Sequence, residues 1–193
     1  MNLIDIFPKT IGSVLLHEDI NLYKKYLLEQ PINYFTESDA TTTNERILDT
    51  SIFKPLVNNI ILNTKEYLNQ LNIIYSDIQI ISSWAYFSRK GNVPNNFHYH
   101  ANSFISGVFY LTPGCDIIFK KINHNFFTPK SNDKIGYRDD LFSVTPQENL
   151  LLLFPSELSH AIGDQNIDGT RISIAFNIIP KGEFGDTTRK IWI

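Results

Sequence analysis

Basic residues, cysteines and long apolar runs are scarce in this sequence, and each scarcity excludes a class of protein. Lys and Arg number 17 against 20 Asp and Glu, which gives a formal net charge of -3. No basic surplus exists to attract a phosphate backbone, so nucleic-acid binding is not indicated. Apolar runs such as Leu150–Phe154 fall far short of the about 20 residues that a membrane helix needs, so we expect no membrane span.

Cys115 is the single cysteine of the 193 residues. No intramolecular disulfide can form, which favours a reducing compartment. The segment Met1–Asp5 has neither the basic start nor the long apolar stretch of a secretory signal. We therefore expect a cytoplasmic protein. Its 42% hydrophobic and 19% charged residues are typical of a globular chain, and its length suits one domain, residues 1–193.

Apolar residues recur at three- and four-residue steps in two N-terminal segments, which predicts two helices. The first begins near Glu18 and ends before Pro31. The second spans Phe53–Leu71, with Ser51 as its expected N-cap and Pro55 in its first turn, where proline is tolerated. We expect a short strand at residues 3–7 and an exposed loop at residues 36–44.

After Asn72 the pattern changes to alternation, which predicts about eight strands in succession. They are expected at residues 78–88, 98–100, 104–112, 117–121, 141–145, 150–154, 171–178 and 190–193, with a turn at 89–96 and a surface insertion at 124–137. Consecutive strands favour an antiparallel sheet. We therefore predict a mainly β protein: a double-stranded β-helix (a jelly roll, cupin-like) in residues 76–193. Residues 1–75 would supply an N-terminal strand and helices packed on one outer face.

Three histidines and one arginine carry the chemistry that the sequence suggests. His98 and His100 stand two apart on a predicted strand, so both side chains point to one face. His160 follows the end of another predicted strand and can reach back over the mouth of a barrel. Neutral imidazoles bind Fe, Zn, Cu or Ni. The three residues are therefore candidate metal ligands, or alternatively hydrogen-bonded residues at the rim of the sheet.

Arg171 opens the last long predicted strand and shares a face with Ser173. If this face is solvated, the charge needs no partner. If Arg171 points into the barrel instead, it requires an anion, because an unpaired buried charge is very costly. A carboxylate would supply a two-point contact, and Ser173 could add a hydrogen bond.

Three blocks of sequence between Trp84 and Asn177 together resemble the 2OG-Fe(II) oxygenases of bacteria and their phages. They are His98-x-His100-x-Asn102-Ser103-x-Ile105-Ser106-Gly107-Val108-x-Tyr110-Leu111, then Phe154-Pro155-Ser156-x-Leu158-x-His160, then Arg171-Ile172-Ser173-Ile174-x-Phe176-Asn177. The resemblance implies Fe(II) bound by the three histidines and 2-oxoglutarate as cosubstrate. Arg171 would pair with the far carboxylate of 2-oxoglutarate, aided by Ser173, Tyr110 and Tyr86. The implied reaction couples decarboxylation to succinate with hydroxylation of a substrate.

His100 departs from this family pattern, because the usual set of two histidines and one carboxylate has Asp or Glu at that position. No acidic residue lies beside it; Asp116 is on another predicted strand. The site is then either a three-histidine site or one whose third ligand comes from elsewhere. Two other functions remain open: a three-histidine, cupin-like dioxygenase without 2-oxoglutarate, and a non-catalytic jelly-roll binding module. The substrate is a small molecule, a protein or a peptide, and a homodimer is possible.

Overall fold

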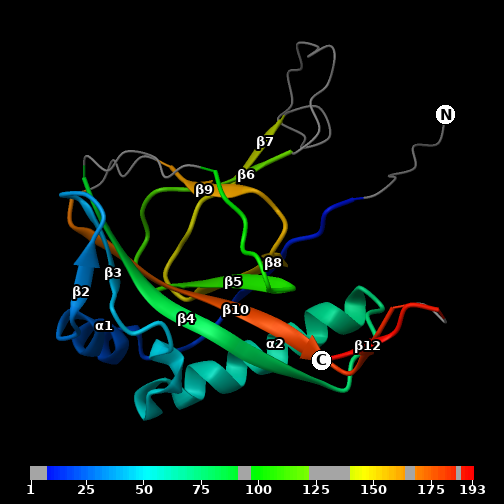
Figure 1. Ribbon diagram of the computed structural model, residues 1–193. Helices are drawn as coiled ribbons and strands as arrows, with labels where there is room; N and C mark the ends of the chain where they lie inside the picture. The colour runs from blue at the N-terminus through cyan, green and yellow to red at the C-terminus, as the bar shows by residue number, and fades with distance from the viewer. Residues whose placement is uncertain (1–7, 91–96, 122–139, 164–167, 186–187) are drawn as a thin grey trace.

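Two facing antiparallel sheets form the centre of the computed structural model, which describes residues 8–90, 97–121, 140–163, 168–185 and 188–193 (Figure 1). The larger sheet has seven strands: β1 (Gly12–Leu15), β8 (Leu150–Pro155), β5 (Ile105–Tyr110), β10 (Thr170–Lys181), β4 (Asp77–Arg89), β3 (Asp39–Thr42) and β2 (Ile32–Tyr34), in that order. The smaller has three: β7 (Leu141–Val144), β6 (Ile117–Lys120) and β9 (His160–Ile162). The two antiparallel sheets form the predicted sandwich, although neighbouring strands in the larger sheet are mostly not consecutive in the sequence.

The two predicted helices are present, α1 at Ile20–Leu28 and α2 at Lys54–Gln70. Asp19 caps α1 by accepting a hydrogen bond from the Leu22 N–H. The predicted cap of α2 is wrong: Ser51 lies in a short 3-10 helix, η2 (Ser51–Phe53), which follows another, η1 (Ile47–Asp49). Residue Phe53 then precedes α2 with no side-chain cap. The backbone enters α2 through a tighter helical turn, so the cap position lies two residues later than predicted.

The helices cover the outer face of the larger sheet, as predicted (Figure 1). One apolar core joins the two layers, with Tyr23, Leu27, Leu56, Ile60 and Leu68 from the helices and Phe87, Phe109, Leu151, Ile172 and Ile174 from the sheet. A second, smaller core lies on the inner side and combines Tyr110, Leu152 and Phe154 with Ile117 and Phe119 of the smaller sheet. The larger core holds the helices on the sheet, and the smaller core holds the two sheets at a fixed separation, because interiors pack to near-crystalline density.

Strand β10 has an apolar face toward the helices and a polar face toward the cavity between the sheets. Its apolar residues Ile172, Ile174 and Ile178 are buried in the outer core against the helices. Because side chains alternate along a strand, Arg171 and Ser173 point to the opposite face, between the two sheets. The possibility that this polar set is solvated is therefore excluded, since Arg171 is 1% exposed.

Two predictions about secondary structure are wrong. The segment predicted as an exposed loop, residues 36–44, contains β3, which pairs with both β2 and β4 and buries Asp39 and Thr42. The buried residues of β3 are polar, so no apolar alternation marks it as a strand in the sequence. Their side chains are satisfied by hydrogen bonds to β4. The strand predicted at residues 98–100 is also absent: His98 forms an isolated bridge, and His100 lies outside any strand.

The remaining predictions concern the ends and connections. The C-terminal strand exists as β12 (Ile191–Trp192), but it pairs with β11 (Glu183–Phe184) in a separate hairpin rather than joining a larger sheet. The strand predicted at residues 3–7, most of the turn at 89–96 and the insertion at 124–137 lie outside the described residues. Among the described helices, none is both long and apolar enough to cross a membrane.

Candidate active site

The three candidate metal ligands meet at one end of the space between the sheets, although two of them are not on strands. The His98 N–H donates to the His160 carbonyl at 3.0 Å, and the His160 N–H donates to the His98 carbonyl at 2.9 Å. The His100 N–H donates to the Ser156 carbonyl at 2.9 Å. The segment that holds His98 and His100 is therefore fixed by backbone hydrogen bonds to the segment that leads into His160.

The imidazole rings of these residues form a compact group. Ring centroids are 4.5 Å apart for His98 and His160, 5.2 Å for His100 and His160, and 5.3 Å for His98 and His100. One nitrogen from each ring lies within 4.8 Å of the other two. Metal–nitrogen bonds of about 2.0–2.1 Å place two ligands of one ion at most about 4 Å apart, so small side-chain rotations bring all three onto a single metal.

Burial favours the neutral form of two of the histidines, His100 and His160. Burial, and secondarily the nearby His98, lower the pKa of His100 to about 4. Burial also lowers the pKa of His160 to about 4, although its hydrogen bond to the Leu158 carbonyl acts in the opposite direction. Both rings are therefore unprotonated at neutral pH, as metal binding requires. The Nδ1 of His160 lies 2.8 Å from that carbonyl, which fixes the proton on Nδ1 and leaves Nε2 for a metal.

Arg171 is the most deeply buried charge of the site. Its guanidinium takes part in none of the ion pairs among the described residues, and its Nε and Nη1 have no hydrogen-bond partner. Its Cζ lies 5.1 Å from the ring centre of Tyr110, whose buried hydroxyl also lacks a partner. Burial raises the pKa of Tyr110 to about 12, so this hydroxyl stays a donor. Three unused donors thus converge where an anion would satisfy them.

Ser173 and Tyr86, which the sequence also suggested, lie beside Arg171 on the inner face. Ser173 is 2% exposed and stands opposite Tyr86 on β4 and Tyr110 on β5. The Tyr86 hydroxyl donates to Asp39 at 2.9 Å. A carboxylate already accepts from Tyr86, so direct contact between Tyr86 and a cosubstrate stays a prediction. Asp39 itself is buried, and the sequence had placed it in an exposed loop.

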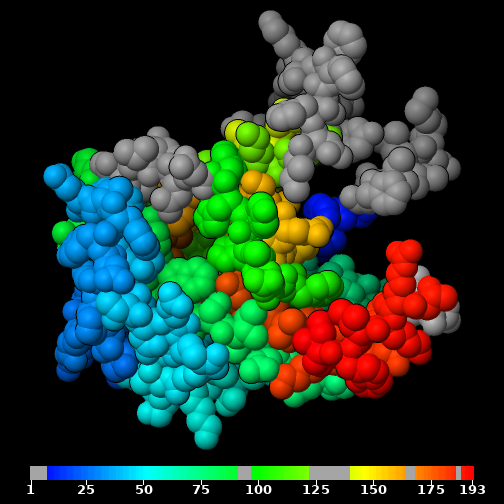
Figure 2. Space-filling model, in the orientation of Figure 1, coloured from blue at the N-terminus to red at the C-terminus, as the bar shows by residue number. Residues whose placement is uncertain are grey.

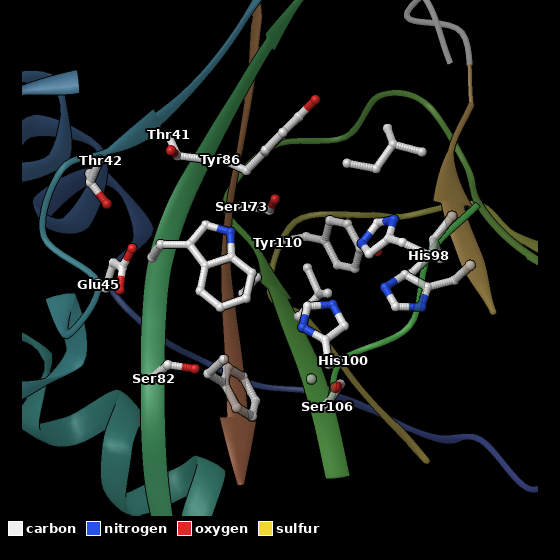
Figure 3. Close-up of a pocket in the computed structure, with 18 of the residues that line it drawn as sticks. Thr41, Thr42, Glu45, Ser82, Tyr86, His98, His100, Ser106, Tyr110 and Ser173 are labelled. Carbon is white, nitrogen blue, oxygen red and sulfur yellow. The ribbon is translucent and has the colours of Figure 1, made fainter. Parts of the chain in front are cut away.

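One cavity of about 570 Å³ is lined by the three histidines, by Arg171 and by a third wall, which we define as Thr41, Thr42 and Glu45. Figure 2 shows a recess on this face, between the blue N-terminal segments and the green segments from the middle of the chain. In the close-up of Figure 3, Thr41, Thr42 and Glu45 stand on one side, and His98 and His100 on the other. Sequence reasoning missed this third wall, because no motif marks a polar strand and the turn that follows it.

Side chains behind His100 were also missed as functional candidates. Asn177 Nδ2 lies 3.2 Å from His100 Nδ1, and Trp84 stacks on the same imidazole with ring centres 5.6 Å apart. The sequence does show that polar and apolar residues alternate along β10, which puts Asn177 on the same face as Arg171 and Ser173. Nothing in the sequence indicated that this face reaches the histidines.

A comparison with protein families assigns the chain to a known class of enzyme. The family model described as "Putative 2OG-Fe(II) oxygenase" matches residues 82–177, about half of the chain and all four of His98, His100, His160 and Arg171. The chain belongs to the 2OG-Fe(II) oxygenase family. It is thus an oxygenase that depends on Fe(II) and 2-oxoglutarate, as the resemblance implied. A comparison with curated protein sequences finds no match.

Solved structures of this family share the fold. HygX from Streptomyces hygroscopicus, determined with nickel and 2-oxoglutarate bound, is 11% identical with a TM-score of 0.61, over 89% of this chain and 83% of HygX. The epimerase SnoN from nogalamycin biosynthesis is 12% identical with a TM-score of 0.65, over 89% and 77%. A prolyl-4-hydroxylase from Pseudomonas putida is 12% identical with a TM-score of 0.58, over 90% and 94%. The predicted double-stranded β-helix with helices on one face is confirmed.

Proposed function

We propose that His98, His100 and His160 bind the Fe(II) of this oxygenase and that Arg171 binds the far carboxylate of 2-oxoglutarate. The observation that supports this most directly is the buried guanidinium. Arg171 has two unpartnered nitrogens in the same cavity as a group of three imidazoles. A buried cation without an anion is costly, so the site is built for a ligand that brings one.

Side chains on β10 and β5 would bind the far carboxylate of 2-oxoglutarate. Arg171 offers a planar pair of donors that matches a carboxylate, and the Tyr110 and Ser173 hydroxyls beside it can each donate one more hydrogen bond. The three histidines would hold the metal. Bound Fe(II) would supply the oxidative decarboxylation of 2-oxoglutarate by O2, which yields succinate and CO2 and delivers one oxygen atom to a substrate C–H bond.

The substrate would enter from the third wall of the cavity. Thr41 and Glu45 face the histidines across the open space, so a substrate held there would present a C–H bond to the metal (Figure 3). This wall is preorganised: the Glu45 carbonyl accepts from the Ser83 N–H at 2.7 Å, and the Thr42 hydroxyl accepts from the Ala85 N–H at 3.1 Å. We propose that hydroxylation is the reaction and that this wall selects the substrate.

The two rival functions explain the cavity less well. A three-histidine dioxygenase without 2-oxoglutarate would use the metal group but would leave the buried Arg171 charge without a partner. A non-catalytic binding module would leave both the imidazoles and Arg171 without a purpose, although unsatisfied buried donors are costly to keep.

Visible absorption of the anaerobic protein tests this function. Addition of Fe(II) and 2-oxoglutarate is expected to produce the weak charge-transfer band of an iron-chelated keto acid. Succinate is the matched control, because it lacks the keto group and is expected to give no band. A folded protein that retains iron but shows no band with 2-oxoglutarate would favour a rival function.

A further inference from the structure

We propose that Asn177 is a positioning residue for His100: its side-chain carbonyl accepts the Nδ1 proton of His100 and leaves Nε2 for the metal. This inference rests on the proposed function. It adds that a chain of serine hydroxyls fixes the orientation of the Asn177 amide. The ligand that replaces the usual carboxylate is thereby held in the form that binds metal.

A continuous polar chain runs from His100 into the protein. Asn177 contacts His100 Nδ1 at 3.2 Å and the Ser82 hydroxyl at 3.0 Å through one end of its amide, and Ser106 Oγ at 2.8 Å through the other. Ser106 Oγ lies 2.9 Å from Ser156 Oγ, which lies 2.8 Å from Ser103 Oγ. Asn177, Ser106 and Ser156 are all buried, so each is expected to find a hydrogen-bond partner within the protein.

The far end of this chain fixes its direction. Ser103 Oγ lies 3.2 Å from the Ile105 carbonyl and 3.3 Å from the Ile178 carbonyl, and carbonyls only accept. In these contacts Ser103 uses its single proton on a carbonyl and accepts from Ser156. Ser156 then donates to Ser103, and Ser106 donates to Ser156. Ser106 has no second proton, so it must accept a hydrogen bond from Asn177.

This direction requires the amide nitrogen of Asn177 to face Ser106. In the structure as it stands, Oδ1 is on the Ser106 side and Nδ2 faces His100. That orientation would need Ser106 to donate to Asn177, so no proton would remain for the contact of Ser106 with Ser156 unless the whole row of serines reversed its hydrogen bonds. The two ends of an amide are distinguished by their hydrogen bonds alone, and a half-turn about the last side-chain bond exchanges them without moving any other atom.

After the half-turn both ends of the amide and the His100 Nδ1 proton have partners. The Asn177 nitrogen donates to Ser106, while Oδ1 has two lone pairs for the Ser82 hydroxyl and the His100 Nδ1 proton. His100 then has the same form as His160, whose Nδ1 lies 2.8 Å from a backbone carbonyl. Two of the three imidazoles would thus present Nε2 to the metal because a carbonyl holds the proton on the other nitrogen.

Substitution of Asn177 separates positioning from packing. In Asn177→Leu a group of similar size cannot accept the proton, so His100 loses its orientation. In Asn177→Asp a carboxylate oxygen still accepts the His100 proton, although the hydrogen bond donated to Ser106 is lost, so the orientation of His100 is kept and a negative charge is added behind it. Removal of such a partner typically weakens metal binding about 10- to 100-fold. Ser88→Ala is the control, because Ser88 is a buried serine of the neighbouring strand β4 that forms none of the hydrogen bonds between Asn177 and Ser103.

The experiment uses Co(II) as the probe, with affinities from competition against a chelator and proton NMR of the Co(II) protein. We expect Asn177→Leu to bind about 10- to 100-fold more weakly and to lose one exchangeable, metal-shifted imidazole N–H signal. Asn177→Asp should keep that signal and bind at least as tightly as wild type, and Ser88→Ala should change neither. Equal affinity and an intact signal in Asn177→Leu, or an Asn177→Asp protein as weak as Asn177→Leu, would overturn the inference alone. Wild-type protein that binds no Co(II) would overturn the proposed function itself.

Discussion

Arg171→Leu is expected to raise the 2-oxoglutarate concentration needed for half-saturation by about 30- to 1,000-fold while Fe(II) binding is retained. The physical reason is that the far carboxylate would be buried without its charge partner, a loss of about 2–4 kcal/mol that converts at 1.4 kcal/mol per factor of ten. The measurement is a titration of the anaerobic, iron-loaded protein with 2-oxoglutarate, followed by the charge-transfer band.

The unliganded Arg171→Leu protein should be no less stable than wild type, and a urea unfolding curve in the absence of 2-oxoglutarate checks this. Leucine removes a buried cation that has no ion-pair partner among the described residues, and apolar replacement of buried charges is often neutral or stabilising. Arg89→Leu is the matched control, because it removes an exposed guanidinium from the neighbouring strand β4. An unchanged 2-oxoglutarate requirement in Arg171→Leu would mean that the cosubstrate binds elsewhere.

His160→Ala is expected to abolish stoichiometric Fe(II) binding, with an affinity loss greater than about 100-fold. Loss of an outer partner of a metal ligand already costs about 10- to 100-fold, and His160 is a proposed ligand itself. Its ring is the most central of the three, at 4.5 and 5.2 Å from the other two. Equilibrium dialysis with metal analysis gives both the stoichiometry and the affinity.

A urea unfolding curve separates loss of the metal site from loss of folding, because alanine keeps the backbone hydrogen bonds with His98 but removes the imidazole that packs on Phe119 and Phe154. His17→Ala is the control, since His17 is an exposed histidine outside the cavity. Retention of one tightly bound iron per chain in His160→Ala would contradict the three-histidine ligand set.

Much of the fold could be predicted from the sequence because the apolar pattern is strong where the core is formed. The helix at α2 and the strands at β4, β5, β8 and β10 have clear periods, and each buries its apolar face in the outer core. The same alternation placed Arg171 and Ser173 on one face. Strand β3 was not predictable in this way, since its buried residues Asp39 and Thr42 are polar and are stabilised by hydrogen bonds to β4.

The metal ligands could be identified from sequence, but the reason that they meet could not. The predicted common strand face of His98 and His100 does not exist; backbone hydrogen bonds to His160 and Ser156 bring them together instead. Such contacts join segments about 60 residues apart, and no local pattern encodes them. For the same reason the Asn177 amide behind His100 emerged only from the structure. The single-domain organisation and the individual roles of the site residues stay predictions.

An anaerobic crystal structure with Fe(II) and 2-oxoglutarate tests the central claim most directly, because it counts the protein ligands of the metal. We expect one nitrogen each from His98, His100 and His160 on a single iron, with the far carboxylate of 2-oxoglutarate on Arg171. An iron held by only two of these histidines, by a carboxylate from elsewhere in the chain, or with 2-oxoglutarate bound away from Arg171, would contradict it.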